Sequence, residues 1–117
     1  MEELIGKVGR LRVYIGEDEY LKNNTPLYRA LLQKARKLDI AGGTAIKGVD
    51  GYGGNTRMLR RTRFLDLSED MPVVVELIDK RENLAKLEDF LREHMTKGLV
   101  TYEEVEVLGY GNSGFKE

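Results

Sequence analysis

Residues 72–78 read Pro-Val-Val-Val-Glu-Leu-Ile and form the most apolar stretch of the chain. Successive side chains of a strand point to opposite faces of a sheet. The residues that share the first face are Val73, Val75 and Leu77. The second face is also apolar, because Val74 and Ile78 flank Glu76. An open sheet normally keeps one face polar, so we expect this face to pack against other subunits, with Arg12 and Glu76 as partners there. The alternative is a modestly apolar open sheet.

A first helix is predicted after Thr25 and Pro26. Thr25 is a good N-cap, and Pro26 suits the first helical position because its missing N–H costs nothing there. Gly42 or Gly43 is expected to end this helical region. The predicted buried stripe consists of Leu27, Leu31, Ala35 and Leu38.

A second helix is predicted to begin at Asp79 and Glu82, which form an Asp variant of the capping box. Gly98 is expected to stop it. The residues of its predicted buried stripe are Leu84, Leu87, Leu91 and Met95.

The remaining periodic segments are strands, because their apolar residues alternate with polar ones. The four main strands are predicted at residues 8–15, 44–49, 73–78 and 99–108, and residues 64–67 are expected to re-enter a short additional strand before the turn at Ser68. Taken with the helices, the order is β-α-β-β-α-β. This order predicts an α+β, ferredoxin-like fold, in which two helices cover one face of an antiparallel four-stranded sheet.

Composition narrows the possible functions. The 117 residues suit one domain covering residues 1–117, and we expect residues 110–117 to be a flexible tail. The absence of cysteine excludes disulfides and thiolate metal sites, and His94 alone cannot build a histidine metal cluster within one subunit. A balance of 19 basic and 20 acidic residues argues against nucleic-acid binding. No targeting signal or membrane-length apolar run is present, which favours a cytoplasmic protein without membrane insertion.

A glycine-rich segment, Gly51-Tyr52-Gly53-Gly54-Asn55-Thr56-Arg57, is the first candidate ligand site. Its backbone N–H groups could form an anion-binding nest. It fails as a dinucleotide fingerprint, because Thr56 occupies the place of the third glycine, and it lacks the ending of a phosphate-binding P-loop. A plain loop between two strands is the alternative.

Four arginines follow closely, and guanidinium groups bind phosphates or carboxylates through paired hydrogen bonds. They are Arg57, Arg60, Arg61 and Arg63. A solvated basic loop and a contact surface for a protein partner are the other interpretations.

The turn Lys97-Gly98-Leu99-Val100-Thr101 is the second candidate. A helix C-terminus explains Lys97 and Gly98 without any ligand. The turn becomes a functional candidate only if the fold brings it beside the Gly51 segment, and the two can lie at the same end of the sheet, one from each neighbouring subunit. His94 is a weaker candidate, because a lone helical histidine is usually a surface or packing residue.

The sequence resembles the nitrogen regulatory PII proteins and, more closely, a family of PII-like proteins from bacteria and archaea. The likeness runs from Leu11 to about Tyr110 and rests on five stretches. They are Leu11-Arg12-Val13-Tyr14-Ile15-Gly16-Glu17, Pro26-Leu27-Tyr28, Gly48-Val49-Asp50-Gly51-Tyr52-Gly53, residues 67–76 (Leu-Ser-Glu-Asp-Met-Pro-Val-Val-Val-Glu) and Gly98-Leu99-Val100-Thr101.

The resemblance implies a homotrimer with its sheets facing inward. It also implies adenine nucleotides bound between subunits, and a loop after the second strand that contacts a regulated transporter or enzyme. The positions that match ligand-contacting residues of the PII proteins are Thr44, Gly51, Gly53, Asn55, Lys97, Gly98 and Thr101, and we add Gly54 and Arg57 from the same loop. Arg60, Arg61 and Arg63 would contact the partner. We expect the ligand to be ATP, ADP, AMP or another small anion, because residues 54–57 depart from the glutamine-lysine-glycine run of the PII proteins.

These observations favour a trimeric regulatory protein that senses a small anionic ligand. The alternatives are a small enzyme, with Asp50, Arg57 or His94 in the chemistry, and a nucleic-acid-binding module on the same fold. No nucleophile–base pair is recognisable in the sequence, so we expect a protein that is not an enzyme.

Overall fold

A computed structural model describes residues 4–52 and 71–111 of the chain. Its strands are β1 (Gly6–Gly16), β2 (Gly42–Lys47), β3 (Pro72–Asp79) and β4 (Leu99–Val107). Its helical segments are α1 (Leu27–Lys37), α2 (Arg81–Leu84), the 3₁₀ turn η2 (Ala85–Leu87) and α3 (Glu88–His94).

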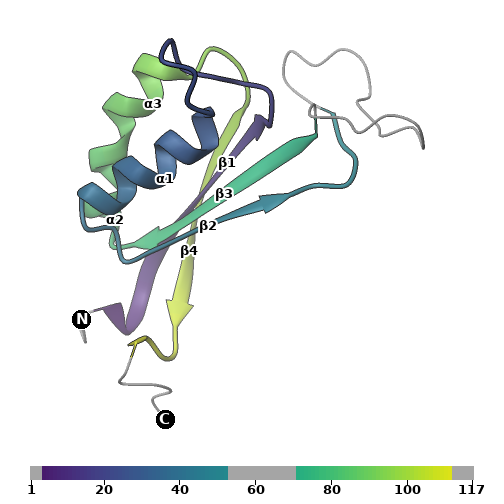
Figure 1. Ribbon diagram of the computed structural model, residues 1–117. Coiled ribbons are helices and arrows are strands. Elements are labelled where there is room, and N and C mark those ends of the chain that lie inside the picture. The colour runs from purple at the N-terminus through teal and green to yellow at the C-terminus, as the bar shows by residue number, and fades with distance from the viewer. Residues whose placement is uncertain (1–3, 53–70, 112–117) are drawn as a thin grey trace.

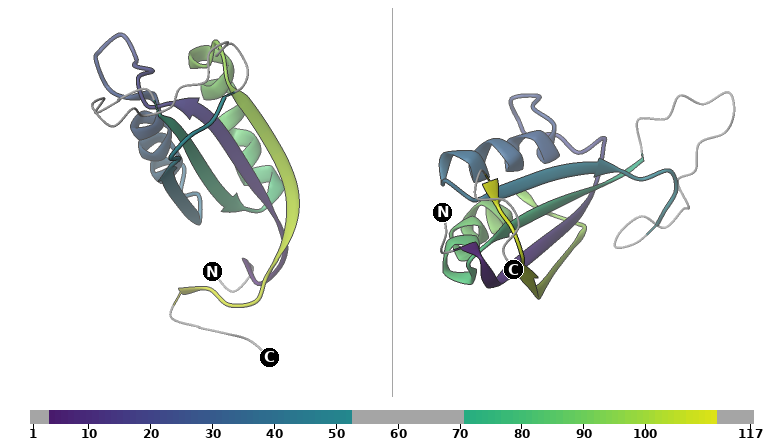
Figure 2. Two further views of the ribbon diagram at one scale, coloured as in Figure 1. Left: turned by 90° about the vertical axis from the view of Figure 1, so that its right-hand side faces the viewer. Right: turned by 90° about the horizontal axis from the view of Figure 1, so that it is seen from below.

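The four strands form one antiparallel sheet in the order β2-β3-β1-β4. All the helical segments lie on one face of this sheet (Figures 1 and 2). The opposite face, which we call the uncovered face, has no helix over it in the described part of the chain. The predicted α+β, ferredoxin-like arrangement is therefore confirmed.

The core lies between the sheet and the helices. Alternate residues of β1 and β3 enter it, and both predicted helical stripes supply the other side, although Leu38 and Met95 are only partly buried. The residues that fill the centre, each with no exposed surface, are Val13, Leu31, Val75, Leu77 and Leu87. The period-two and helical spacings of the sequence thus predicted which side chains are buried.

The start of α1 differs from the prediction. Its N-cap is Pro26, and no side chain caps the helix. Thr25 instead belongs to a turn, where its carbonyl oxygen accepts from the Leu21 N–H at 2.8 Å. The Leu27 N–H donates to the Glu19 carbonyl oxygen at 2.8 Å, so backbone from the preceding loop replaces the expected hydroxyl cap.

The capping box predicted at Asp79 and Glu82 is also wrong. Lys80 occupies the N-cap of α2 without a side-chain cap. Asp79 ends β3 with only 2% of its surface exposed. Its Oδ2 accepts from the Ala41 N–H at 2.9 Å, and its Oδ1 accepts from the Lys80 N–H at 2.6 Å and from Asn83 Nδ2 at 2.9 Å. The carboxylate therefore joins the start of β2 to the end of β3.

Several predicted boundaries shift. The helix α1 ends at Lys37, before Gly42 and Gly43, which begin β2. The second helical region is divided by η2 and ends at His94, before Gly98. The predicted strand 64–67 lies outside the described residues. Of the predicted tail, Tyr110 is fixed, because its hydroxyl donates to the Ala41 carbonyl oxygen at 2.9 Å.

Candidate functional site

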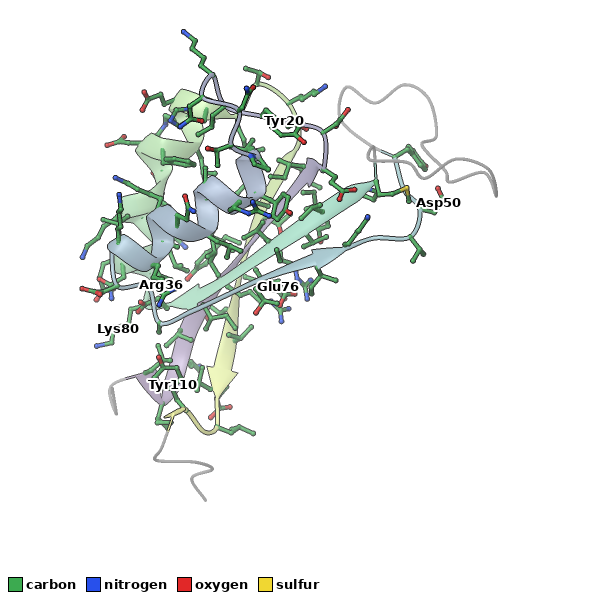
Figure 3. The ribbon with its side chains drawn as sticks, viewed as in Figure 1. Tyr20, Arg36, Asp50, Glu76, Lys80 and Tyr110 are labelled. Atoms are coloured by element: carbon green, nitrogen blue, oxygen red, sulfur yellow. The ribbon has the colours of Figure 1, made fainter. Side chains whose placement is uncertain are left out.

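The two candidate ligand segments leave the sheet at the same end. β2 ends at Lys47, which pairs with Val73, and β4 begins at Leu99, which pairs with Tyr14. Figure 3 shows Asp50, at the base of the first segment, beyond this end of the sheet, far from Lys80 at the other end. This is the common end that the sequence suggested.

Within one chain, however, the segments lie on opposite edges. β2 and β4 are the two outer strands, separated by β3 and β1. Three strand spacings correspond to about 14 Å. Within one subunit, the strands that lead to Gly51 and away from Lys97 are therefore separated by the width of the sheet.

The base of the first segment is held against β3. The Gly48 N–H donates to the Pro72 carbonyl oxygen at 2.7 Å. A Cβ at Gly51 would lie 3.2 Å from Pro72 Cγ, so a side chain there would press on the proline ring. Tyr52 follows with 81% of its surface exposed. The segment thus begins with backbone packed on the sheet and continues with an aromatic side chain that is free to contact another molecule.

Neighbouring loops brace this base. Lys47 Nζ lies 3.3 Å from Glu17 Oε1, and the Glu17 N–H donates to the Met71 carbonyl oxygen at 2.8 Å. The two ends of the 48–71 connection are therefore tied to the residue that follows β1.

Gly98 shapes the second segment. Its φ of +118° is a conformation that disfavours side chains, and a Cβ would lie 2.5 Å from the Tyr14 carbonyl oxygen. The glycine is required by this close approach. Lys97, immediately before it, is exposed and faces no ion-pair partner among the described residues.

Thr44 and Thr101, the last residue of the second segment, lie on the two outer strands of the uncovered face. Thr44 pairs with Glu76, Glu76 with Arg12, and Arg12 with Thr101, so the four form one row across the sheet. Both threonines are exposed at its two ends. Their candidate role therefore depends on what covers this face.

Arg12 and Glu76 pair with each other inside one chain, with Arg12 Nε 2.9 Å from Glu76 Oε2. This hydrogen bond raises the pKa of the Arg12 guanidinium above its usual value. Arg10 Nη2 lies 2.7 Å from Glu103 Oε1, and that bond lowers the pKa of Glu103. The sequence identified Arg12 and Glu76 but not their register, which depends on how two distant strands align.

An apolar row crosses the uncovered face beside these charges, towards the end that carries both segments. Its members, one from each strand in sheet order, are Ile46, Val74, Tyr14 and Leu99. Ile46 is 48% exposed and Leu99 is 53% exposed. The sequence indicated Val74, but Ile46 and Leu99 were missed because isolated apolar residues on edge strands carry no pattern of their own.

The other predicted site residues lie outside the described part of the chain. They are Gly53, Gly54, Asn55, Arg57, Arg60, Arg61 and Arg63. Within residues 4–52 and 71–111, no group of histidine and carboxylate side chains is arranged to hold a metal ion, and no helix is long and apolar enough to cross a membrane. The His94 ring packs against the Phe90 ring at a tilt of 51°, with the ring centroids 4.5 Å apart, which is a packing role.

Comparison with solved structures shows where the fold recurs. A protein from Thermus thermophilus, described as PII-like and signalling, superimposes with a TM-score of 0.61 and 17% identity over 87% of this chain and 90% of its own. A nitrogen regulatory PII-like protein from Thiomonas intermedia, CPII bound to ADP, AMP and bicarbonate, gives 0.55 and 16% over 86% and 88%. At these identities the likeness concerns the fold.

Sequence comparison gives the family. A UPF0166 protein of Aquifex aeolicus is 36% identical over 99 residues, which cover 84% of this chain and 90% of that protein. A second relative, UPF0166 protein MJ1524 of Methanocaldococcus jannaschii, is 27% identical over 77 residues, covering 66% and 68%. The DUF190 family (Uncharacterized ACR, COG1993) matches residues 8–107. The chain therefore belongs to the DUF190 family and has the fold of PII-like signalling proteins.

Proposed function

We propose that the protein is a trimeric PII-like regulator, acting in the cytoplasm, that binds a small anionic ligand between subunits and contacts a partner protein through the 51–63 loop. The observation that carries this proposal is the position of the two candidate segments, at one end of the sheet but on opposite edges. A site that uses both is complete only where two subunits meet. The proposed role is in binding and not in catalysis.

The uncovered face supports the assembly. Ile46 and Leu99 leave about half of their surface exposed, and large apolar residues exposed together mark interaction surfaces. The neighbouring charges are already paired within the chain, so a second subunit can cover them without leaving an isolated ion. An adenine nucleotide is the first ligand to test, since CPII, which shares the fold, is bound to ADP.

Lys97 is the described residue best suited to an anion. It is exposed, it lies beside the close-packed Gly98, and a lysine ammonium is a common phosphate ligand. With Thr44, Gly51, Gly98 and Thr101 it makes up the described part of the proposed site. Gly53, Gly54, Asn55 and Arg57 complete the proposal, and Arg60, Arg61 and Arg63 would meet the partner.

Calorimetry of the purified protein against ATP, ADP, AMP, cyclic AMP and bicarbonate tests the ligand. We expect one of them to bind, and Lys97→Ala to weaken binding by about tenfold or more, because a charged hydrogen-bond partner is lost. Lys86→Ala removes another exposed lysine, on η2, and should leave the affinity unchanged. Light scattering should return the mass of three chains. A monomer mass, or no binding of any of these ligands, contradicts the proposal.

A further inference from the structure

The outer surface of α1 is uniformly basic or neutral. Its exposed residues are Arg29, Gln33, Lys34, Arg36 and Lys37, and the helix contains no acidic residue. In the described part of the chain, Lys34, Arg36 and Lys37 form no ion pair. By contrast, Arg92 on α3 is held by Glu88 and Asp89 at 3.0 and 3.3 Å. The exposed side of α1 therefore carries positive charge that no acidic side chain of the described residues neutralises.

A cleft of about 210 Å³ adjoins this surface, between α1, the turn before it and α3. Leu21, Ala30 and Phe90 supply its apolar lining. Sites for drug-sized molecules usually enclose about 300–1,000 Å³. The cleft is smaller than that, and its size suits one apolar side chain of a peptide.

The rest of the lining offers hydrogen-bond donors. Lys34 and Lys37 contribute ammonium groups, and Asn23, Thr25 and Gln33 contribute amide and hydroxyl groups. Asn23 Oδ1 already accepts from the Thr25 N–H at 3.1 Å, so its Nδ2 group remains as a donor. No carboxylate lines the cleft. Such a lining favours a ligand that is rich in acceptors and negatively charged.

The wall formed by the turn is held in place before any ligand arrives. The Leu21 N–H donates to the Thr25 carbonyl oxygen at 2.8 Å, and the Asn24 N–H donates to the Leu21 carbonyl oxygen at 2.9 Å. Preformed walls lower the entropy cost of binding. The helix dipole alone would favour Lys34, Arg36 and Lys37 in the last turn of α1. It does not account for an adjoining apolar cleft with donors around it.

We propose that this α1 cleft binds an acidic segment of a partner protein. One apolar side chain of the segment enters between Leu21, Ala30 and Phe90, and the flanking carboxylates pair with Lys34 and Lys37. The cleft is lined by residues of α1 and α3, and both helices lie on the helix-covered side of the sheet, opposite the uncovered face (Figure 2). Each subunit would therefore offer its own cleft, whether or not it assembles into the proposed trimer.

Fluorescence anisotropy with a labelled peptide, Gly-Glu-Asp-Leu-Glu-Asp-Gly, tests the inference. We expect saturable binding that weakens by about tenfold or more in the double variant Lys34→Glu/Lys37→Glu, because like charges then face each other. Replacing the leucine of the peptide by serine should also weaken binding, which separates a seated side chain from a purely ionic contact.

The matched control is Lys80→Glu/Lys86→Glu, which makes the same change in charge outside the cleft and should keep the affinity of the unchanged protein. Circular dichroism checks that both variants fold. Equal affinity in the two double variants overturns the proposal, as does equal affinity for the leucine and serine peptides. Binding to phosphatidylglycerol vesicles without binding to the peptide also overturns it, and indicates a lipid surface as the partner.

Discussion

Arg12 Nε lies 2.9 Å from Glu76 Oε2 at the centre of the uncovered sheet face, and the two residues are direct cross-strand neighbours on β1 and β3. Arg10 and Glu103 make a second pair alongside, and Arg12 Nη1 also reaches Glu103 Oε1 at 3.5 Å. Two cations and two anions thus neutralise one another on a face that no helix covers in the described part of the chain. A protein surface can be buried at moderate cost when its charges arrive already paired, and a buried charge without its partner is costly.

The Glu103 pairing predicts a loss of stability in acid. The hydrogen bond from Arg10 lowers the pKa of Glu103 below its ordinary value of 4.5. The unfolded chain therefore takes up this proton at higher pH than the folded one. The stabilisation that the Arg10–Glu103 bond provides is complete above about pH 4.5. It is lost as the pH falls through the lower pKa that Glu103 has in the folded chain.

Glu103→Gln should flatten the pH dependence of the urea midpoint in that acidic window. Glu104→Gln, at the neighbouring position on β4, is the matched control because its carboxylate makes no ion pair with the described residues. If the two variants show the same slope in acid, the Arg10–Glu103 bond has no effect on stability.

Gly98→Ala should destabilise the fold by about 1–3 kcal/mol. The positive φ of Gly98 is strained for alanine, and the new Cβ would meet the Tyr14 carbonyl oxygen at 2.5 Å. Gly42→Ala is the control, because a Cβ there meets nothing within 4 Å. Urea unfolding of both variants measures the difference. A small and equal effect at the two positions would show that the turn before β4 tolerates a side chain.

Tyr110→Phe should lower the free energy of unfolding by about 1 kcal/mol, the usual net value of one hydrogen bond. The lost bond joins the Tyr110 hydroxyl to the Ala41 carbonyl oxygen, and Ala41 is also held through its N–H by Asp79. Tyr20→Phe removes a hydroxyl from a residue that is 55% exposed and should change nothing. Unaltered stability in Tyr110→Phe would mean that the bond from the Tyr110 hydroxyl to Ala41 contributes nothing to the stability of the fold.

Burial was predictable from the sequence because it follows from local spacing. The alternation from Val73 to Ile78 identified both faces of β3, and the four-residue spacing of Leu27, Leu31 and Ala35 identified the inner side of α1. These patterns need no knowledge of the rest of the chain.

The ends of elements and the contacts between strands were not predictable in the same way. Thr25 does not cap α1, because the Leu27 N–H donates to the Glu19 carbonyl oxygen. The Asp79 carboxylate accepts from the Ala41 N–H, 38 positions away in the sequence. The Arg12–Glu76 pair likewise depends on the register of β1 against β3. Each of these outcomes was decided by a partner that only the folded chain brings close.

The apolar row on the uncovered face predicts how assembly can be broken without unfolding the subunit. Ile46→Asp/Leu99→Asp places charges at positions that are about half exposed in the single chain, so the subunit should keep its fold and its circular dichroism spectrum. In a trimer formed through this face, the same carboxylates would be buried without partners, and burial of an unpaired charge is strongly unfavourable. Light scattering should therefore return the mass of one chain in place of three.

Tyr20→Asp is the control for this change. Tyr20 is 55% exposed and lies in the loop between β1 and α1, so a carboxylate there should leave the trimer intact. The proposed assembly face is ruled out if the Ile46 and Leu99 variant remains trimeric. If both variants become monomeric, the loop before α1 takes part in the subunit contact as well, and assembly is not confined to the uncovered face.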